Sequence, residues 1–164
     1  MKQKGLRYDG SIDKYPITQG EVYSLANGSK ITIADITLEI PEFSKNADCV
    51  FIDPAGNKGV LKAYYTKAEK ECPVQSFDEF VAHIKKCIEQ INPNRLFVEC
   101  FARNKNQIIP MVESLFPYVK IYNSTYYHNK KNVCWIVQGS KTEEDWGLEG
   151  MDEWDAVFKI CKDV

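Results

Sequence analysis

The sequence predicts an α/β fold with a mostly parallel sheet that ends in an antiparallel hairpin. Apolar segments of strand length alternate with amphipathic segments of helix length, a pattern that favours parallel strands with right-handed crossovers. The run at 48–52 is continuously apolar, which predicts a central strand buried on both faces. The strand-like runs at 118–123 and 133–137 are joined by a loop without a crossover helix, so they are expected to pair antiparallel.

Composition excludes several classes of protein. The chain has 164 residues, of which 44% are hydrophobic and 27% charged, and these values exclude disordered and fibrous classes. The net charge of −2 excludes a surface given over entirely to nucleic acid, so contact with nucleic acid would need a local basic patch. Apolar runs are far shorter than the roughly 20 residues of a membrane helix, and no apolar signal core follows the N-terminus. We therefore expect no membrane contact and a cytoplasmic location.

One domain is expected over residues 1–164. Residues 1–17 show little periodicity and predict an irregular arm, whereas residues 142–164 form an acidic C-terminal extension. Six cysteines occur without any C-x-x-C spacing, and only two histidines accompany them. This pattern predicts free thiols in a reducing compartment and no metal site.

The remaining elements follow from local signals. The strongest helix prediction is residues 76–91, where Ser76 and Glu79 form a capping box and Asn92-Pro93 stops the helix. A short helix is expected within 18–30, and the β-branched alternation of 31–36 predicts the first strand. Further along the chain we expect a strand at 95–101, a helix at 106–116 and a short helix at 152–160.

The segment 51–59 is the sharpest candidate site. An apolar strand there delivers Asp53 to the sheet edge, Pro54 stiffens the exit, and two glycines allow a ligand to approach the backbone closely. In open α/β sheets ligands bind beyond the carboxyl ends of the strands, where Asp35, Asp53 and the loop after Phe101 are expected. An ordinary turn with an incidental aspartate remains the alternative.

Other catalytic motifs are absent from the sequence. It contains neither the phosphate-binding pattern G-x-x-x-x-G-K-[ST] nor the dinucleotide pattern G-x-G-x-x-G. It also lacks the G-x-S-x-G elbow, so acyl transfer has no support.

A family resemblance covers roughly residues 31–141. The Asp35-Ile36 strand, followed by the apolar strand that ends in Asp53-Pro54, resembles S-adenosylmethionine-dependent methyltransferases that modify the exocyclic amino group of adenine. The similarity is greatest to their circularly permuted branch, which includes messenger-RNA adenosine methyltransferases. It implies a Rossmann-like methyltransferase sheet, either complete or truncated, and a nucleic-acid substrate.

The resemblance also implies roles for individual residues. Asp53 and Pro54 would be catalytic, because in the family this aspartate and the adjoining carbonyl accept hydrogen bonds from the target amino group and orient its nitrogen. Asp35 and Ile36 would lie against the adenine ring of S-adenosylmethionine. Asp53 would border that cofactor as well, and Lys141 would lie near its methionine end.

The sequence departs from the family pattern at two positions of this motif. Ala55 replaces the second proline, and Gly56 replaces the aromatic residue that stacks on the target base. The glycine-rich cofactor loop is also missing. These departures support an alternative function, namely a catalytically inactive module that binds nucleic acid or a protein partner. They also suggest that a partner chain or a second copy completes the cofactor pocket.

The segment 123–132 mixes aromatic and basic residues. Such a mixture suits single-stranded nucleic acid, since rings stack on bases and lysines neutralise phosphates. A solvated hairpin tip is the equal alternative, and a solvated helix face is the alternative for the lysines that follow Asp53-Pro54. The substrate-binding residues expected in these two segments are Asn57, Lys58, Tyr126, Tyr127, His128, Lys130 and Lys131.

Overall fold

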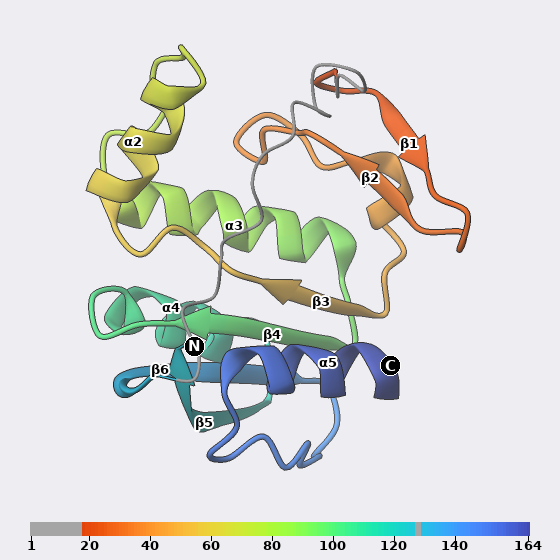
Figure 1. Cartoon of the computed structure of the whole chain (residues 1–164), viewed down its shortest axis with the longest axis vertical. Coiled ribbons are helices and arrows are strands. Elements are labelled where there is room, and N and C mark those ends of the chain that lie inside the picture. The colour runs from red at the N-terminus through yellow and green to blue at the C-terminus, as the bar shows by residue number, and fades with distance from the viewer. Residues whose placement is uncertain (1–17, 127–128) are drawn as a thin grey trace, which may run out of the picture.

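The structure is a computed structural model that describes residues 18–126 and 129–164, except for the side chains at 129–132 (Figure 1). It has a four-stranded sheet, a separate two-stranded sheet and helices packed on the larger sheet. In chain order the elements are strands β1 (Val22–Ser24) and β2 (Lys30–Thr32), the 3-10 helix η1 (Glu42–Ser44), strand β3 (Cys49–Ile52), helices α2 (Lys58–Lys67) and α3 (Phe77–Ile91), strand β4 (Arg95–Cys100), helix α4 (Lys105–Glu113), strands β5 (Tyr118–Tyr126) and β6 (Asn129–Ser140), and helix α5 (Glu153–Asp163).

The main sheet has the strand order β3-β4-β6-β5. Strand β3 pairs with β4 in parallel, and β6 runs antiparallel to both β4 and β5. The predicted α/β class, the parallel pair and the antiparallel hairpin are therefore confirmed. The prediction of a mostly parallel sheet is wrong, because β6 lies between β4 and β5 and makes two of the three strand pairs antiparallel. Because β6 is antiparallel to both of its neighbours, β5 runs in the same direction as β4.

The predicted central position of β3 is wrong, because β3 is an edge strand in the described sheet. Its apolar run has another cause. Val50 and Ile52 pack on the core beneath α3 and α4, whereas Cys49 and Phe51 pack on the core beneath α5. An edge strand covered on both faces needs the same apolar residues as a central strand, so the pattern cannot tell the two apart.

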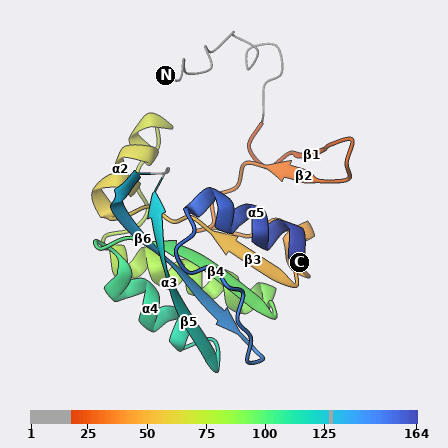
Figure 2. The same ribbon diagram turned by 60° about the horizontal axis from the view of Figure 1, so that its bottom comes forward.

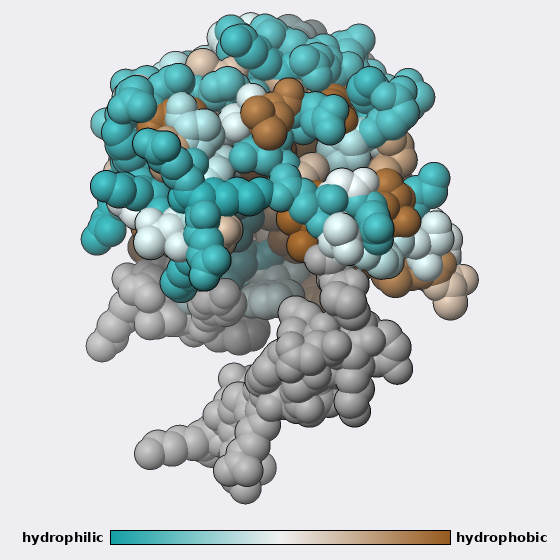
Figure 3. All heavy atoms as spheres, turned by 90° about the horizontal axis from the view of Figure 1, so that it is seen from above, coloured by the Kyte–Doolittle hydropathy of each residue, from teal (hydrophilic) through white to brown (hydrophobic). Residues whose placement is uncertain are grey.

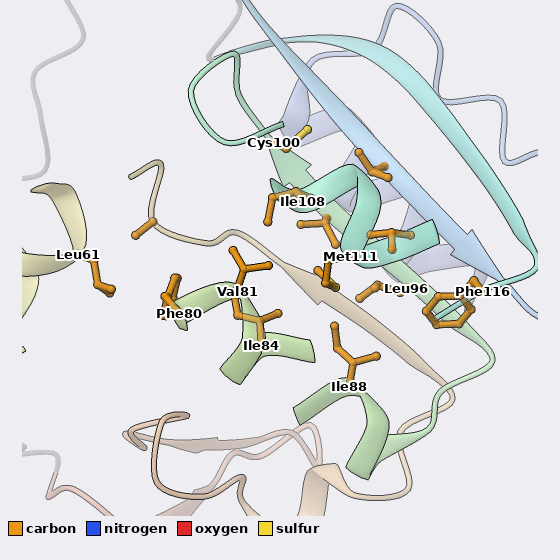
Figure 4. Packing of buried hydrophobic residues seen from close by; sticks show 14 of the residues in the cluster. Leu61, Phe80, Val81, Ile84, Ile88, Leu96, Cys100, Ile108, Met111 and Phe116 are labelled. Atoms are coloured by element: carbon orange, nitrogen blue, oxygen red, sulfur yellow. The ribbon is translucent and has the colours of Figure 1, made fainter. Parts of the chain in front are cut away.

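Alternating residues of β4 face two different cores. Leu96 and Val98 belong to the larger core with α3 and α4, which Figure 4 shows in detail, and Phe97 belongs to the smaller core with α5. Helix α5 thus covers the face of the sheet opposite to α3 and α4 (Figure 2). The Phe116 ring, which follows α4, packs closely against Gly139 of β6. Only glycine fits there, since a Cβ at this position would lie 2.6 Å from the ring.

The N-terminal region differs from the prediction. Instead of a short helix within 18–30, β1 and β2 form an antiparallel hairpin, with Gly28 in a left-handed conformation at φ 85°. This hairpin forms its own sheet and contributes no strand to the main one. The strand predicted at 31–36 ends at Thr32. Seen from the hairpin side, the described surface is mainly hydrophilic with separate hydrophobic patches (Figure 3).

Three helices agree with the sequence signals to within a few residues. In α3 the Ser76 hydroxyl accepts a hydrogen bond from the Glu79 amide at 3.1 Å, and Glu79 in turn accepts one from the Gln75 amide. Helix α4 spans Lys105–Glu113 and ends three residues before the predicted limit, while α5 extends beyond residue 160 to Asp163. No helix in the described ranges combines the length and apolar character needed to cross a bilayer.

Candidate functional site

The parallel strands β3, β4 and β5 end at the same edge of the sheet. The residues that follow β3 and β4 enclose a cavity of about 620 Å3 together with the end of β5. This is the edge at which ligands bind in open α/β sheets. The cavity is lined by Gly56, Asn57, Val60, Phe101, Ala102, Arg103, Tyr126 and Val133.

The loop after β3 is held in place at both ends. Pro54 and Ala55 are buried, and Ala55 packs in the larger core. Asn57 caps α2, because its side-chain oxygen accepts a hydrogen bond from the Val60 amide at 3.0 Å. Between these anchors Gly56 borders the cavity, and a Cβ on Gly56 would meet nothing within 4 Å. The position of Gly56 therefore has room for a side chain.

Aromatic rings and one cation line the opposite wall of the cavity. Phe101 and Tyr126 pack edge to face, with ring centroids 5.6 Å apart and an interplanar angle of 81°. The turn that carries Arg103 is fixed by Asn104, whose side-chain oxygen accepts a hydrogen bond from the Phe101 amide at 2.7 Å. A planar ligand and an anionic group attached to it would both find complementary chemistry here.

Two carboxyl groups lie near the ends of β3 and β4, on the side of the sheet that α5 covers. Ile52 is paired with Val98, so the next residues, Asp53 and Glu99, continue β3 and β4 side by side. Asp53 is exposed, yet partial burial raises the pKa of its carboxyl above the ordinary value. Burial raises the pKa of Glu99 to about 7, and the charges of Asp53 and Glu153 contribute to that rise.

Asp35 lies elsewhere in the structure. Its carboxylate accepts hydrogen bonds from the Thr37 amide and hydroxyl and from the Tyr65 hydroxyl of α2, the last at 2.9 Å. Burial alone would raise the pKa of Asp35, but the bonds from Thr37 and Tyr65 hold it below its usual value. The turn from Asp35 to Thr37 explains why no strand continues through this segment. Asp35 therefore occupies a separate cavity of about 270 Å3 beside α2, and the structure does not place it in one cleft with Asp53.

Two further residues of the predicted cofactor set are also far from the candidate site. The Lys141 ammonium donates to both oxygens of Asn92, at 3.0 Å and 2.8 Å, where α3 ends. Lys141 follows Ser140, which pairs with the first residue of β4, so it lies at the opposite end of the sheet from Asp53. Ile36 lies beside Asp35. The four predicted cofactor residues are thus not gathered in one place.

The predicted substrate residues are partly gathered. Asn57 and Tyr126 line the same cavity, whereas the Lys58 ammonium donates to the Gln75 carbonyl. Tyr127 and His128 lie outside the described residues, as do the side chains of Lys130 and Lys131. Arg103 and Val60 also line the cavity, and no sequence motif indicated them. Arg103 could have been predicted from its position just beyond a parallel strand, where ligands bind in open α/β sheets.

The comparisons with known proteins add no identification. No family model, curated protein or solved structure matches this chain. The geometry of the strand ends and the resemblance of the Asp53-Pro54 segment are therefore the basis for a function.

Proposed function

We propose that the chain is a methyltransferase-like protein that acts on an amino group of a nucleic-acid base, with adenine as the preferred base. One observation carries the proposal. The Asp53-Pro54 pair follows a parallel strand, and Gly56 and Asn57, just beyond it in the chain, line a cavity with two aromatic rings and an arginine. A volume of about 620 Å3 is within the range of small-ligand sites and is ample for one base.

The residues of this chain would bind and orient the acceptor base. The Asp53 carboxylate, together with the adjoining backbone carbonyl, accepts hydrogen bonds from the exocyclic amino group and so directs the nitrogen lone pair away from itself. Phe101 or Tyr126 offers a ring for contact with the base, and Arg103 offers a positive charge to a neighbouring phosphate. The raised pKa of Asp53 makes its carboxylate a better acceptor of such a hydrogen bond.

The aromatic residues of the cavity bear on the most serious departure from the family motif. The family carries its stacking ring at the position of Gly56, which has no side chain here. Tyr126 and Phe101 line the same cavity as Gly56, and the space beside Gly56 is open. A ring supplied by strand β5 or by the end of β4 would therefore take over the contact with the base.

S-adenosylmethionine is the methyl donor that the resemblance implies, and the described residues do not form a complete pocket for it. Asp35 and Ile36 lie beside α2, and Lys141 lies at the far end of the sheet. In the proposed function a partner chain or a second copy of this chain would supply the missing contacts. The Rossmann-like character of the sheet belongs to the same proposal, and it is supported by three strands of one direction with an antiparallel strand among them.

The first experiment measures methyl transfer from S-adenosylmethionine to adenine in a single-stranded oligonucleotide, followed by mass spectrometry. Asp53→Asn keeps the shape but replaces the carboxylate with a weaker acceptor, so we expect the rate to fall by about a hundredfold. Oligonucleotide affinity should change much less. The matched control is Asp78→Asn, an exposed aspartate in the first turn of α3. Full activity of Asp53→Asn would refute the proposed role.

The second experiment restores the missing ring. Gly56→Tyr places an aromatic side chain in open space beside the cavity, and Gly56→Ala adds only a methyl group. Stacking on one base contributes about 1–3 kcal/mol, so the tyrosine variant should bind the oligonucleotide at least fivefold more tightly. The alanine variant should bind like the parent. Equal affinity of all three proteins would place the base outside this cavity.

A second function is favoured by the scattered positions of Asp35, Ile36 and Lys141. A catalytically inactive module would bind nucleic acid at the same cavity but would neither bind S-adenosylmethionine nor transfer a methyl group. A calorimetric titration with S-adenosylmethionine distinguishes the two functions. Oligonucleotide binding without any heat of cofactor binding would select the inactive module.

A further inference from the structure

A buried group of potential metal ligands lies between the main sheet and α5. Glu99 comes from β4, Cys134 from β6 and Glu153 from the first turn of α5. All three residues are buried, and one ligand atom from each lies within 4.8 Å of the other two. The three residues are far apart in sequence, so no sequence motif indicates that they lie together.

Glu99 is the least compensated member of this group. The residue is only 3% exposed, and among the described residues its Oε1 atom has no hydrogen-bond partner. Within the described part of the chain, the charges that act on Glu99 are those of Asp53 and Glu153, which are both negative. Burying a carboxylate without a hydrogen bond or a positive charge is costly, so this position calls for a ligand that provides one.

We propose that Glu99, Cys134 and Glu153 bind a divalent transition-metal cation, with Zn2+ as the best match. Zinc accepts cysteine sulfur at about 2.3 Å and carboxylate oxygen at about 2.0–2.2 Å, which is the ligand chemistry of these three side chains. Contraction of the group by roughly 1 Å brings all three atoms to such distances, and glutamate side chains can provide it by rotating. The fourth position is left to water or to a further ligand.

The local structure holds the ligands in place. Glu99 is paired with Ile136, and Cys134 is paired with Ser124, so both lie within regular parts of the sheet. The Ser124 hydroxyl donates to the Met151 carbonyl at 2.6 Å, which fixes the chain just before α5.

The Asp152 carboxylate then caps α5 by accepting from the Asp155 amide at 2.9 Å, and Glu153 follows directly. A bound cation would therefore join α5 to β4 and β6. The site does not depend on the proposed methyl transfer, because none of its ligands lines the base cavity.

The test is titration of the full chain with ZnCl2 by calorimetry and with CoCl2 by absorption spectroscopy. We expect one cation per chain and, with Co2+, the near-ultraviolet charge-transfer band of a cobalt–thiolate bond. Mg2+ should not compete, because it prefers oxygen ligands alone. The variants Glu99→Gln and Cys134→Ser should each weaken Zn2+ binding by roughly tenfold to a hundredfold or more. Cys161→Ser, which removes an exposed thiol on α5, should leave the affinity unchanged.

A measurement of thermal unfolding separates metal binding from a folding defect. Glu99→Gln removes a buried negative charge, so its melting temperature without metal should equal or exceed that of the parent. Zinc should raise the melting temperature of the parent and of Cys161→Ser but not that of Glu99→Gln. Absence of the cobalt–thiolate band, or unchanged Zn2+ affinity in Glu99→Gln and Cys134→Ser, would overturn the proposal. Glu99 would then be a protonated carboxyl next to Glu153.

Discussion

The two faces of the main sheet bury different chemistry. Beneath α3 and α4 the core is almost wholly apolar, and it continues from β4 to Phe116 and the helices. Beneath α5 the apolar core is smaller, and the same face also buries Glu99, Ser124 and Gln138. The contrast indicates that the first face provides most of the stability. The second face buries polar groups, which need hydrogen-bond or charge partners. The proposed cation site lies on this face.

The largest expected effect tests the apolar face. Leu96→Ala removes a side chain that is 0% exposed beneath α3 and α4, and it should lower the free energy of unfolding by about 3 kcal/mol. Urea denaturation monitored by circular dichroism measures this change. Leu38→Ala is the control, since Leu38 is 77% exposed and its loss should cost under about 0.5 kcal/mol. Similar losses in both variants would contradict the assignment of the core.

A smaller effect is expected on the polar face. The Tyr122 hydroxyl lies 2.7 Å from Gln138 Oε1 and 3.0 Å from Asp145 Oδ1, and it accepts a hydrogen bond from the Trp146 amide. Tyr122→Phe leaves the ring in the core but leaves these groups without that hydroxyl. We expect a loss of about 1–2 kcal/mol in the free energy of unfolding.

Tyr118→Phe is the matched control for that variant, because Tyr118 lies on the same strand and is 45% exposed. The control should unfold at the same urea concentration as the parent. If Tyr122→Phe also unfolds there, the hydroxyl network does not contribute to stability.

The smallest effect concerns pH. Burial tends to raise the pKa of Glu144, but hydrogen bonds from Ser140 and Arg95 outweigh it and hold that pKa below the ordinary value. A lowered folded-state pKa means that Glu144 stabilises the fold above its ordinary pKa and that this contribution is lost as pH falls through the folded-state value. Because the pair with Arg95 is partly exposed, the contribution should be under about 1 kcal/mol.

Unfolding of the parent and of Glu144→Gln, compared from about pH 6 down to about pH 3, measures this contribution. The two proteins should differ most at the upper end of that range and converge at the lower end. A difference that stays constant with pH would show that the carboxylate charge is not involved.

The elements that could be predicted are those fixed by neighbouring residues. The capping box at Ser76 and Glu79 and the stop at Asn92 define α3 within one short segment, and the structure has them as expected. The position of β3 could not be predicted in the same way. Its apolar residues indicate that both faces of the strand are covered, but they do not indicate whether both of its edges pair with other strands. The first hairpin was missed because Gly28 turns the chain where a helix was expected.

The candidate site shows the same division. The location of Asp53 at a strand end follows from the apolar run before it, and the loops that follow Asp53 and Phe101 line one cavity. The prediction that Asp35 lies at the same sheet edge as Asp53 is wrong. The Asp35 side chain accepts a hydrogen bond from the Thr37 amide, and this turn ends the strand early. Residues that meet only through tertiary packing, such as Glu99 and Glu153, leave no local pattern to read.

The position of β6 sets an order in which the protein can assemble. Strand β4 is able to pair with β3 as soon as both have been synthesised, whereas β5 borders β6 in the described sheet. While the ribosome is still adding residues before Asn129, β5 must wait, and one side of β4 stays exposed to water. Once Asn129–Ser140 has been synthesised, it can pair with both β4 and β5, and α5 then packs on the completed sheet. The nascent chain thus completes its sheet late, because one strand supplies the pairing partner of both β4 and β5.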